Sequence, residues 1–444
     1  MRKMLADIVD IRGRVGWKGY TVNDLRNEGP WVIGAHDITS SHKLTLKNAK
    51  HISREKFEES PEIKIEKNDI LIVKVGSTIG KVAIVNYEIG EACINPNTVL
   101  LKNCKEIPQY LYYYLTSDLG QKYLINNSSA SAQSALNQTD LKKLPINFPP
   151  RIVQEKIAGI LSALDDKIEL NNQINAELEA MAKTLYNYWF VQFDFPDEIG
   201  KPYKSSGGKM VYHEVLKREI PEGWEVKKLS ECIEKIIDYR GRTPKKLESD
   251  WSEKKDDIIA LSAKHVKGGK LVNLEAANRV DGNLYSKWMK EELKEGDILM
   301  TSEAPCGEFF YIIGDTKYCL SQRLFAMRAN SEIIHHSCLY FELSAGNGYS
   351  QIMGKVSGST VFGIRQDELR TVNVLVPAKE LQQSFEEKVI PIYQKIRINE
   401  KQNQELAQLR DWLLPMLMNG QVTVGEVEEK MSMVAEEQVG YQKS

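Results

Sequence analysis

The 444-residue sequence has no apolar run approaching the ~20 residues that a membrane-spanning helix needs. Its first residues also lack a secretory signal, so we expect an intracellular, cytoplasmic protein. Only six cysteines occur, and none forms a Cys-x-x-Cys pair. That pattern indicates small buried thiols in a reducing compartment, and neither disulfides nor zinc. What is left is an ordinary chain, 42% hydrophobic and 27% charged, long enough for two or three cores.

The chain also lacks an excess of charge of either sign. Its 59 Lys and Arg residues nearly balance 61 Asp and Glu residues, for a net charge of −2. Nucleic-acid-binding modules are usually clearly basic. Any DNA contact must therefore come from local basic patches, or be shared with partners that carry more positive charge.

Motifs that would supply catalysis are missing as well. The run Gly76 to Lys81 (GSTIGK) is one residue shorter than a phosphate-binding loop and has no Ser or Thr after the lysine, so we predict a β-turn. Neither Asn147-Phe-Pro-Pro nor Asn95-Pro-Asn matches the Asn-Pro-Pro-aromatic element of a base-flipping methyltransferase. We find no nucleophile, cofactor loop or metal site above background. The sequence argues against an enzyme.

What the sequence does contain is a long-range repeat of two heptad patterns. Each pattern has apolar residues at alternating spacings of four and three and is broken by two asparagines, which predicts two long helices that pack together. An offset of 228 residues separates Ile157 from Phe385 and Asn171 from Asn399. The first seam comprises Ile157, Leu161, Leu164, Ile168, Asn171, Asn175, Leu178, Ala182, Leu185 and Trp189. The second comprises Phe385, Val389, Ile392, Ile396, Asn399, Asn403, Leu406, Arg410, Leu413 and Leu417.

The same offset holds outside the helices, which makes a chance likeness of two heptad patterns a poor explanation. Aligned at 228 are Asp10, Arg12, Gly13 and Arg14 with Asp238, Arg240, Gly241 and Arg242, and Asp69 to Leu71 with Asp297 to Leu299. Cys93 matches Cys319 better at 226. The loops of the two copies therefore differ in length, while the order of the aligned segments is the same.

These patterns divide the chain into six parts. We expect an α+β or β-rich unit over 1–149, a long helix over 150–192, a linker over 193–219, a second unit over 220–376, a second long helix over 377–420 and a tail over 421–444. In the first unit we predict strands at Ile63–Ile65, Asp69–Val75 and Val82–Val85, and a helix at Pro108–Leu124 whose tyrosines pack in the core. The first long helix should start after Pro149-Pro150 and end near Trp189, and Pro391 should kink the second or delay its regular part.

In this order, the features resemble the specificity subunits of type I restriction-modification systems. Each unit closes in a Pro-x-x-x-x-Gln helix start, Pro149/Gln154 and Pro377/Gln382. The linker adds Phe195-Pro, Gly200-Lys-Pro-Tyr, Ser205-Ser-Gly-Gly and Ile220-Pro-Glu-Gly-Trp224. The resemblance covers nearly the whole chain. It departs before Met1, where the Ile-Pro-Glu-Gly-Trp entry is absent, and after Gly420.

The resemblance implies two tandem α/β target-recognition domains separated by a pair of long antiparallel coiled-coil helices, in an α+β fold with pseudo-two-fold symmetry. It implies a non-catalytic subunit that reads a bipartite, asymmetric target in double-stranded DNA and holds two methyltransferase (modification) subunits and two restriction (motor) subunits. S-adenosylmethionine, ATP and Mg would then belong to those partners, with no cofactor on this chain. Helices of 35 to 40 residues span roughly 55 to 60 Å, enough to act as a ruler between half-sites.

Candidate DNA contacts are polar residues on loops that differ between the copies, because base edges need hydrogen-bond donors and acceptors. In the first unit they are Arg12, Arg14, Lys18, Lys74, Ser77, Lys81, Gln133, Asn137 and Gln138. In the second they are Arg240, Arg242, Lys245, Lys264, Lys267, Gln322, Arg323, Arg365 and Gln366. For each residue the alternative is a solvated surface role. The four arginines shared at the offset of 228 suit phosphate contacts better than base reading.

Two other functions stay open from the sequence. One is a coiled-coil adaptor that uses the helix pair for protein partners only. The other is a fused restriction enzyme fragment with an overlooked nuclease centre. Basic residues on loops of both units favour DNA binding over a pure adaptor.

Overall fold

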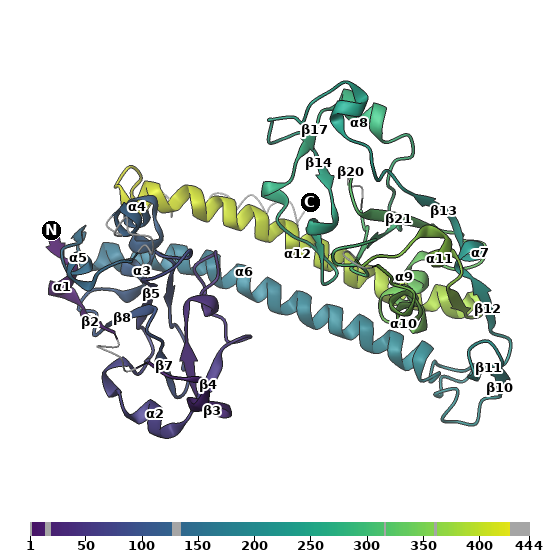
Figure 1. The fold of residues 1–444 in the computed structure, drawn as a ribbon, viewed down its shortest axis with the longest axis horizontal. Coiled ribbons are helices and arrows are strands. Elements are labelled where there is room, and N and C mark those ends of the chain that lie inside the picture. The colour runs from purple at the N-terminus through teal and green to yellow at the C-terminus, as the bar shows by residue number, and fades with distance from the viewer. Residues whose placement is uncertain (1, 14–18, 127–134, 315–316, 359–361, 427–444) are drawn as a thin grey trace. The chain divides into compact units, whose positions relative to one another are not determined.

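The computed structural model describes residues 2–13, 19–126, 135–314, 317–358 and 362–426, which form two compact units. Unit 1 comprises Met1–Leu170 and Gln402–Ser444, and unit 2 comprises Asn171–Lys401. Figure 1 shows the elements of each unit. Each unit therefore holds one α+β domain and one half of each long helix.

The two long helices follow the predicted boundaries closely. Helix α6 spans Arg151–Tyr186 and continues as a π-helical segment, Asn187–Val191, while α12 spans Lys379–Met418. The predicted start after Pro149-Pro150 and end near Trp189 are confirmed. The prediction that Pro391 delays the regular part of α12 is wrong. Val389 and Tyr393 are buried on either side of the proline, and their packing keeps the backbone helical where one hydrogen bond is lost.

Inside each unit the two helix halves pack together. In unit 2, Asn399 contacts Asn175 and Phe385 contacts Trp189, so α12 runs antiparallel to α6. In unit 1, Ile157, Leu161 and Leu164 share a core with Leu413 and Leu417. Every predicted seam residue is buried or half-buried, which confirms the packing surface that the heptad pattern predicts.

Unit 1 is built on two sheets. The four-stranded antiparallel sheet has the order β2 (Asp10–Arg12), β8 (Thr98–Lys102), β5 (Ile70–Val73) and β6 (Val82–Ile84). The three-stranded sheet has the order β4 (Lys50–Ile52), β3 (Leu25–Ile33) and β7 (Ala92–Ile94), with β3 parallel to β7. Strand β1 (Arg2–Met4) pairs with β9 (Pro145–Asn147). The helices are α1 (Leu5–Ile8), α2 (Arg54–Glu58), α3 (Pro108–Thr116), α4 (Asp118–Asn126) and α5 (Gln138–Lys142).

Unit 2 repeats this topology. Its four-stranded sheet has the order β13 (Ile233–Ile237), β21 (Leu324–Ala329), β18 (Ile298–Thr301) and β19 (Phe309–Tyr311). Its three-stranded sheet has the order β17 (Arg279–Val280), β14 (Ile258–Leu261) and β20 (Tyr318–Leu320), and β12 (Glu225–Lys228) pairs with β22 (Asn373–Val376). The helices are α7 (Leu229–Cys232), α8 (Gly282–Trp288), α9 (His336–Ser344), α10 (Asn347–Gly354) and α11 (Gln366–Arg370). Two hairpins are additional, β10 (Met210–His213) with β11 (Arg218–Pro221), and β15 (Val266–Lys267) with β16 (Lys270–Leu271).

Strand β5, an inner strand of the four-stranded sheet of unit 1, is apolar throughout because it is covered on both faces. Ile70 and Ile72 of β5 face the core that α6 and α12 complete, and Leu71 and Val73 face a second core under the three-stranded sheet. Successive side chains of a strand point to opposite faces, so two cores need two apolar sets. The predicted strands at Asp69–Val75 and Val82–Val85 are thus confirmed.

Two predicted elements of unit 1 are wrong. Ile63–Ile65 is not a strand: Pro61–Ile63 forms a 3-10 turn, and Lys64 makes an isolated bridge to Cys93. The predicted helix Pro108–Leu124 breaks into α3 and α4 at Ser117, whose backbone is extended. Ser117 Oγ donates to the Tyr114 carbonyl and accepts from Gly120 N, so it ends one helix and caps the next.

The aligned Asp-x-Arg-Gly runs at 10–13 and 238–241 are not structurally equivalent. In unit 1, Asp10 pairs with Lys102, and in unit 2, Lys235 pairs with Arg328, the counterpart of Lys102. Equivalent residues of β2 and β13 are therefore 225 residues apart. A β-bulge between Ile233 and Lys235 adds one residue to β13. The match at 228 is therefore three residues out of register, and Arg12 and Arg240 do not occupy equivalent positions.

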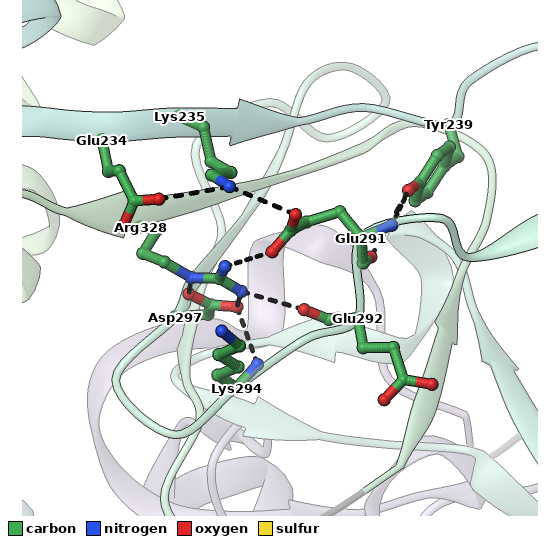
Figure 2. Close-up of polar contacts among 8 residues, drawn as sticks. All are labelled: Glu234, Lys235, Tyr239, Glu291, Glu292, Lys294, Asp297 and Arg328. Carbon is green, nitrogen blue, oxygen red and sulfur yellow. Dashed lines mark hydrogen bonds and ion pairs between the residues drawn. The ribbon is translucent and has the colours of Figure 1, made fainter.

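A buried ion pair fixes the same turn in both units. In unit 2 the Arg328 guanidinium makes two bonds to Asp297, of 2.9 and 2.8 Å, and also reaches Glu291 and the Glu292 carbonyl (Figure 2). In unit 1, Lys102 Nζ lies 2.8 Å from Asp69. The side chain of Asp297 is only 1% exposed, so removing its cation would leave a buried carboxylate unpaired, at a cost of about 3–5 kcal/mol.

The Pro-x-x-x-x-Gln motif has a structural explanation. Gln154 Nε2 donates to the Pro149 carbonyl, and Gln154 Oε1 accepts from the backbone N–H of Ile107, just before α3. In unit 2, Gln382 does the same with Pro377 and with His335, just before α9. Both glutamines are 1% exposed. Each one ties the start of a long helix to the start of a domain helix, α3 or α9, and satisfies an unpaired N–H group there.

Candidate nucleic-acid interface

The predicted contact residues of unit 1 gather at one edge of the four-stranded sheet. Pairing of Arg12 with Leu100 and of Val73 with Thr98 places the ends of β2 and β5 beside the start of β8. Arg12 therefore ends one strand at this edge, and Lys74 follows another. Burial lowers the pKa of the half-buried Lys74 amine.

Loops bring further predicted residues to this edge. Ser77 is exposed in the turn Gly76–Gly80, which confirms that GSTIGK is a turn. The segment before α5 pairs with the strand end, because Leu136 N donates to the Lys74 carbonyl. Asn137 and Gln138 start α5. Gln138 packs against the residue after β2, because a Cβ added to Gly13 would lie only 2.6 Å from Gln138 Nε2.

Two predicted contact residues of unit 1, Lys81 and Arg12, also contact other groups of the chain. Lys81 Nζ donates to the Ile38 carbonyl over 3.2 Å. Arg12 lies 3.3 Å from Asp10 in an exposed ion pair. Arg14, Lys18 and Gln133 lie outside the described residues.

Unit 2 uses the equivalent edge for a polar cluster around Asp238. Its carboxylate accepts two bonds from Arg240 Nε, each of 3.0 Å, and one of 2.7 Å from Gln366 Nε2. Burial opposes the effect, but the bonds from Arg240 and Gln366 lower the pKa of Asp238. The guanidinium of Arg240 also lies 4.2 Å from the centre of the Phe325 ring. Arg240 and Gln366 are thus held in fixed positions, and Arg365 is exposed next to them.

Arg242 has a different environment from Arg240, the other arginine predicted here as a DNA contact. It is half-buried, donates to the carbonyls of Lys287 and Trp288 at the end of α8, and stacks on Tyr239. These contacts satisfy carbonyls that a helix end leaves free. The geometry therefore favours a structural role for Arg242.

Four predicted residues of unit 2 line one cavity of about 560 Å³: Lys245, Lys264, Gln322 and Arg323. They come from three separate segments, the turn after β13, the turn after β14 and the loop between β20 and β21. Arg323 is 3.2 Å from Glu303 and half-exposed. The third predicted lysine of unit 2, Lys267, is exposed on β15, outside the cavity lining.

An aromatic wall completes this cavity. Trp251 lines it, is 37% exposed and leans on the buried Trp288, with ring centroids 5.8 Å apart. Cations beside an exposed indole and amide side chains suit phosphate contact and base stacking or hydrogen bonding. Contact of these residues with DNA stays a prediction.

Sequence reasoning missed one repeated position beside the interface. Asp37 and His265, 228 residues apart, each accept the N–H of the residue that opens a 3-10 turn, Gly34 and Ser262 respectively. Asp37 Oδ1 and His265 Nε2 are buried with no hydrogen-bond partner in the described part of the chain. Burial raises the pKa of Asp37, and burial together with Lys264 lowers that of His265 to about 4. The runs Gly34-Ala-His-Asp37 and Ser262-Ala-Lys-His265, aligned at 228, carried the signal.

The described residues show neither a metal site nor a membrane-spanning helix. They contain no group of three or more His, Cys, Asp or Glu side chains placed to hold a metal ion. None of their helices is long and apolar enough to cross a membrane.

Two copies of one α+β fold, each with polar loops at the same sheet edge and each packed on halves of two long helices, define a duplicated recognition protein. The family model described as "Type I restriction modification DNA specificity domain" matches residues 3–180 and 221–408. The chain belongs to this family, and it is a type I restriction-modification specificity subunit.

Relatives of known name agree over most of the length. The type I restriction enzyme MjaIX specificity subunit of Methanocaldococcus jannaschii is 26% identical over 405 residues, which is 90% of this chain and 88% of the relative. The HindI specificity subunit of Haemophilus influenzae is 24% identical over 470 residues, which is 91% of this chain and 99% of the relative. The crystal structure of a type I S subunit from M. genitalium has a TM-score of 0.56 at 16% identity, covering 94% and 95% of the two chains. This last likeness supports the fold.

Proposed function

We propose that this chain reads a bipartite, asymmetric DNA target, with one half-site contacted by each unit. The observation that carries the proposal is a common frame with different side chains at the same sheet edge. Arg12 and Gly13 of unit 1 stand where unit 2 has Ile237 and Asp238. One frame presents the loops in the same way in both units, and different donors and acceptors then select different bases.

In unit 2 the cavity lined by Lys245, Lys264, Gln322 and Arg323 is the proposed contact surface. In unit 1 it is the edge formed by Arg12, Lys74, Ser77, Asn137 and Gln138. Because the net charge is −2, partner subunits would supply part of the electrostatic attraction for the phosphates.

We further propose that methylation and ATP-dependent cleavage reside in two methyltransferase and two restriction subunits, which hold S-adenosylmethionine, ATP and Mg. Exposed apolar residues recur on the helices at the repeat offset: Leu170 (49%) with Ile398 (61%), and Met181 (59%) with Leu409 (38%). A duplicated apolar surface suits two copies of one partner.

The alternatives predict different results. A coiled-coil adaptor would need no basic cavity, and purified chain that cuts DNA by itself would favour a fused restriction fragment. Sequencing methylated bases in the host genome with and without this gene tests the proposal. We expect one asymmetric motif of two separated halves to lose its methylation without the gene. An unchanged methylation pattern, in a host whose methyltransferase subunit is expressed, would contradict the proposal.

A further inference from the structure

A polar cluster joins the two helices to the domain in unit 1. Asp165 of α6 accepts a hydrogen bond of 2.8 Å from the Tyr113 hydroxyl and one of 2.7 Å from Arg410 Nη1 of α12. The side chains of Asp165 and Arg410 are only 15% and 21% exposed, and Tyr113 is buried. At this depth the carboxylate depends on the charge of Arg410.

The equivalent cluster in unit 2 is aromatic and carries no charge. The residues at the offset of 228 are Phe341 for Tyr113, Tyr393 for Asp165 and Ala182 for Arg410. Phe341 and Tyr393 pack edge to face, with ring centroids 6.1 Å apart. Ala182 is fully buried, so unit 2 has a methyl group where unit 1 has the guanidinium of Arg410.

At a second position the contact is polar in unit 2 and apolar in unit 1. In unit 2 the hydroxyl of Tyr186, on α6, donates to the buried Glu342 over 2.6 Å, and Gly348 N donates to the other oxygen. In unit 1 the equivalent residues are Leu414, on α12, and Tyr114, whose hydroxyl donates to the Pro145 carbonyl. Each unit thus has one polar contact to its second helix segment where the other unit has an apolar one.

We propose that each unit accepts only one of the two equivalent helix segments of this chain. Unit 1 selects the segment 402–418, with Arg410 and Leu414, and unit 2 selects the segment 171–191, with Ala182 and Tyr186. The surface of each unit therefore recognises its own chain and rejects the equivalent segment of a second copy.

The cost of the wrong pairing follows from the contacts. Segment 171–191 in unit 1 would place Ala182 against Asp165 and leave that carboxylate buried without a cation. Segment 402–418 in unit 2 would place Arg410 among Phe341 and Tyr393 and leave Glu342 facing a leucine. An unpaired buried charge costs more than a lost apolar contact, so it discriminates between partners as well as stabilising the correct one.

The test gives α12 of the full chain the side chains of α6. The double variant Arg410→Ala/Leu414→Tyr should lower the unfolding midpoint of unit 1 by about 5 °C or more. Adding Tyr113→Phe and Asp165→Tyr transplants the aromatic cluster of unit 2 and should recover most of this loss. Tyr112 already occupies the position of Tyr340, next to which the new tyrosine packs. The control is Arg151→Ala, which removes the exposed pair with Glu155 and should leave the midpoint unchanged.

A reciprocal test uses unit 2. Tyr186→Leu should destabilise the chain, and Tyr186→Leu/Glu342→Tyr, which copies unit 1, should recover most of the loss. If the double variant of α12 does not fold, the quadruple variant decides, since a restored fold supports selection and an unfolded chain overturns it. A double variant as stable as the wild-type chain, or transplants that recover nothing, would also overturn the proposal.

Discussion

The side-chain amide of Asn399 donates a hydrogen bond of 2.8 Å to Asn175 Oδ1, from α12 to α6 within unit 2. Both side chains are at most 2% exposed. A polar pair in an apolar seam contributes less to stability than two leucines would, but it is satisfied only in one register. The asparagines that interrupt the two heptad patterns thus meet, for this pair, across antiparallel helices.

Replacing one asparagine of this pair should lower the free energy of unfolding more than replacing both. Asn175→Leu leaves the Asn399 amide buried without a partner, a loss of about 1–3 kcal/mol. Asn175→Leu/Asn399→Leu removes both polar groups and should restore or exceed wild-type stability while it loosens the register. Urea unfolding of the three proteins measures the difference. A double variant less stable than the single one would show that the pair contributes to stability itself.

Stability should depend on pH through Glu342. Burial raises the pKa of this carboxyl to about 7, against bonds from Tyr186 and Gly348 that lower it, while the ordinary value is 4.5. The folded state therefore holds a proton that the unfolded state has released. The contribution is complete below pH 4.5 and is lost as the pH rises to 7, by at most about 1.4 kcal/mol per pH unit.

Glu342→Gln removes this titration and keeps a neutral side chain of the same shape. Relative to wild type, the variant should gain stability between pH 4.5 and 7 and stay level above pH 7. Other titrating groups, including His265, are common to both proteins and cancel in the difference. Unfolding free energies at pH 5 and pH 8 report it, and a constant difference would contradict the raised pKa.

Partner binding should follow the duplicated apolar positions. Met181→Asp and Leu409→Asp each place a charge on one exposed position, so each should remove one methyltransferase copy from the complex, and the double variant should remove both. The exposed Ala176→Asp, on another side of α6, is the control. Native mass spectrometry counts the subunits. A single variant that loses both copies would mean that the two positions do not serve separate partners.

The lengths of α6 and α12 should set the spacer between half-sites. Seven residues added to both helices lengthen each by about 10 Å, or roughly three base pairs at ~3.4 Å each. Methylated motifs mapped for such a variant should keep both half-sites and show a longer spacer. An unchanged spacer in an active variant would show that the lengths of the helices do not set the distance between the half-sites.

The long helices could be predicted from sequence because the heptad pattern and the repeat report the same packing surface. Strand β5 could be predicted for the same kind of reason, since its apolar run fills two cores. The break at Ser117 could not, because it depends on the side chain closing onto the Tyr114 carbonyl and on the narrow space around Gly120.

The site was predicted less completely. The bulge at β13 adds one residue without any distinctive sequence, so the shared Asp-x-Arg-Gly letters suggested a false equivalence. The cavity of unit 2 draws on Lys245, Lys264 and Arg323, which only the sheet brings together. The charge of Arg242 predicts a DNA contact, yet its guanidinium binds backbone carbonyls at the end of α8.

The most direct test of separate half-site reading is to map methylated motifs for Lys264→Gln/Arg323→Gln, which changes only the cavity of unit 2. We expect specificity to relax at one or two positions of one half-site, because each lost base or phosphate contact acts locally. The other half-site and the spacer should stay the same, and Lys204→Gln in the linker should change nothing. Equal relaxation of both half-sites, or a motif unaffected by the variant in an active complex, would contradict the account.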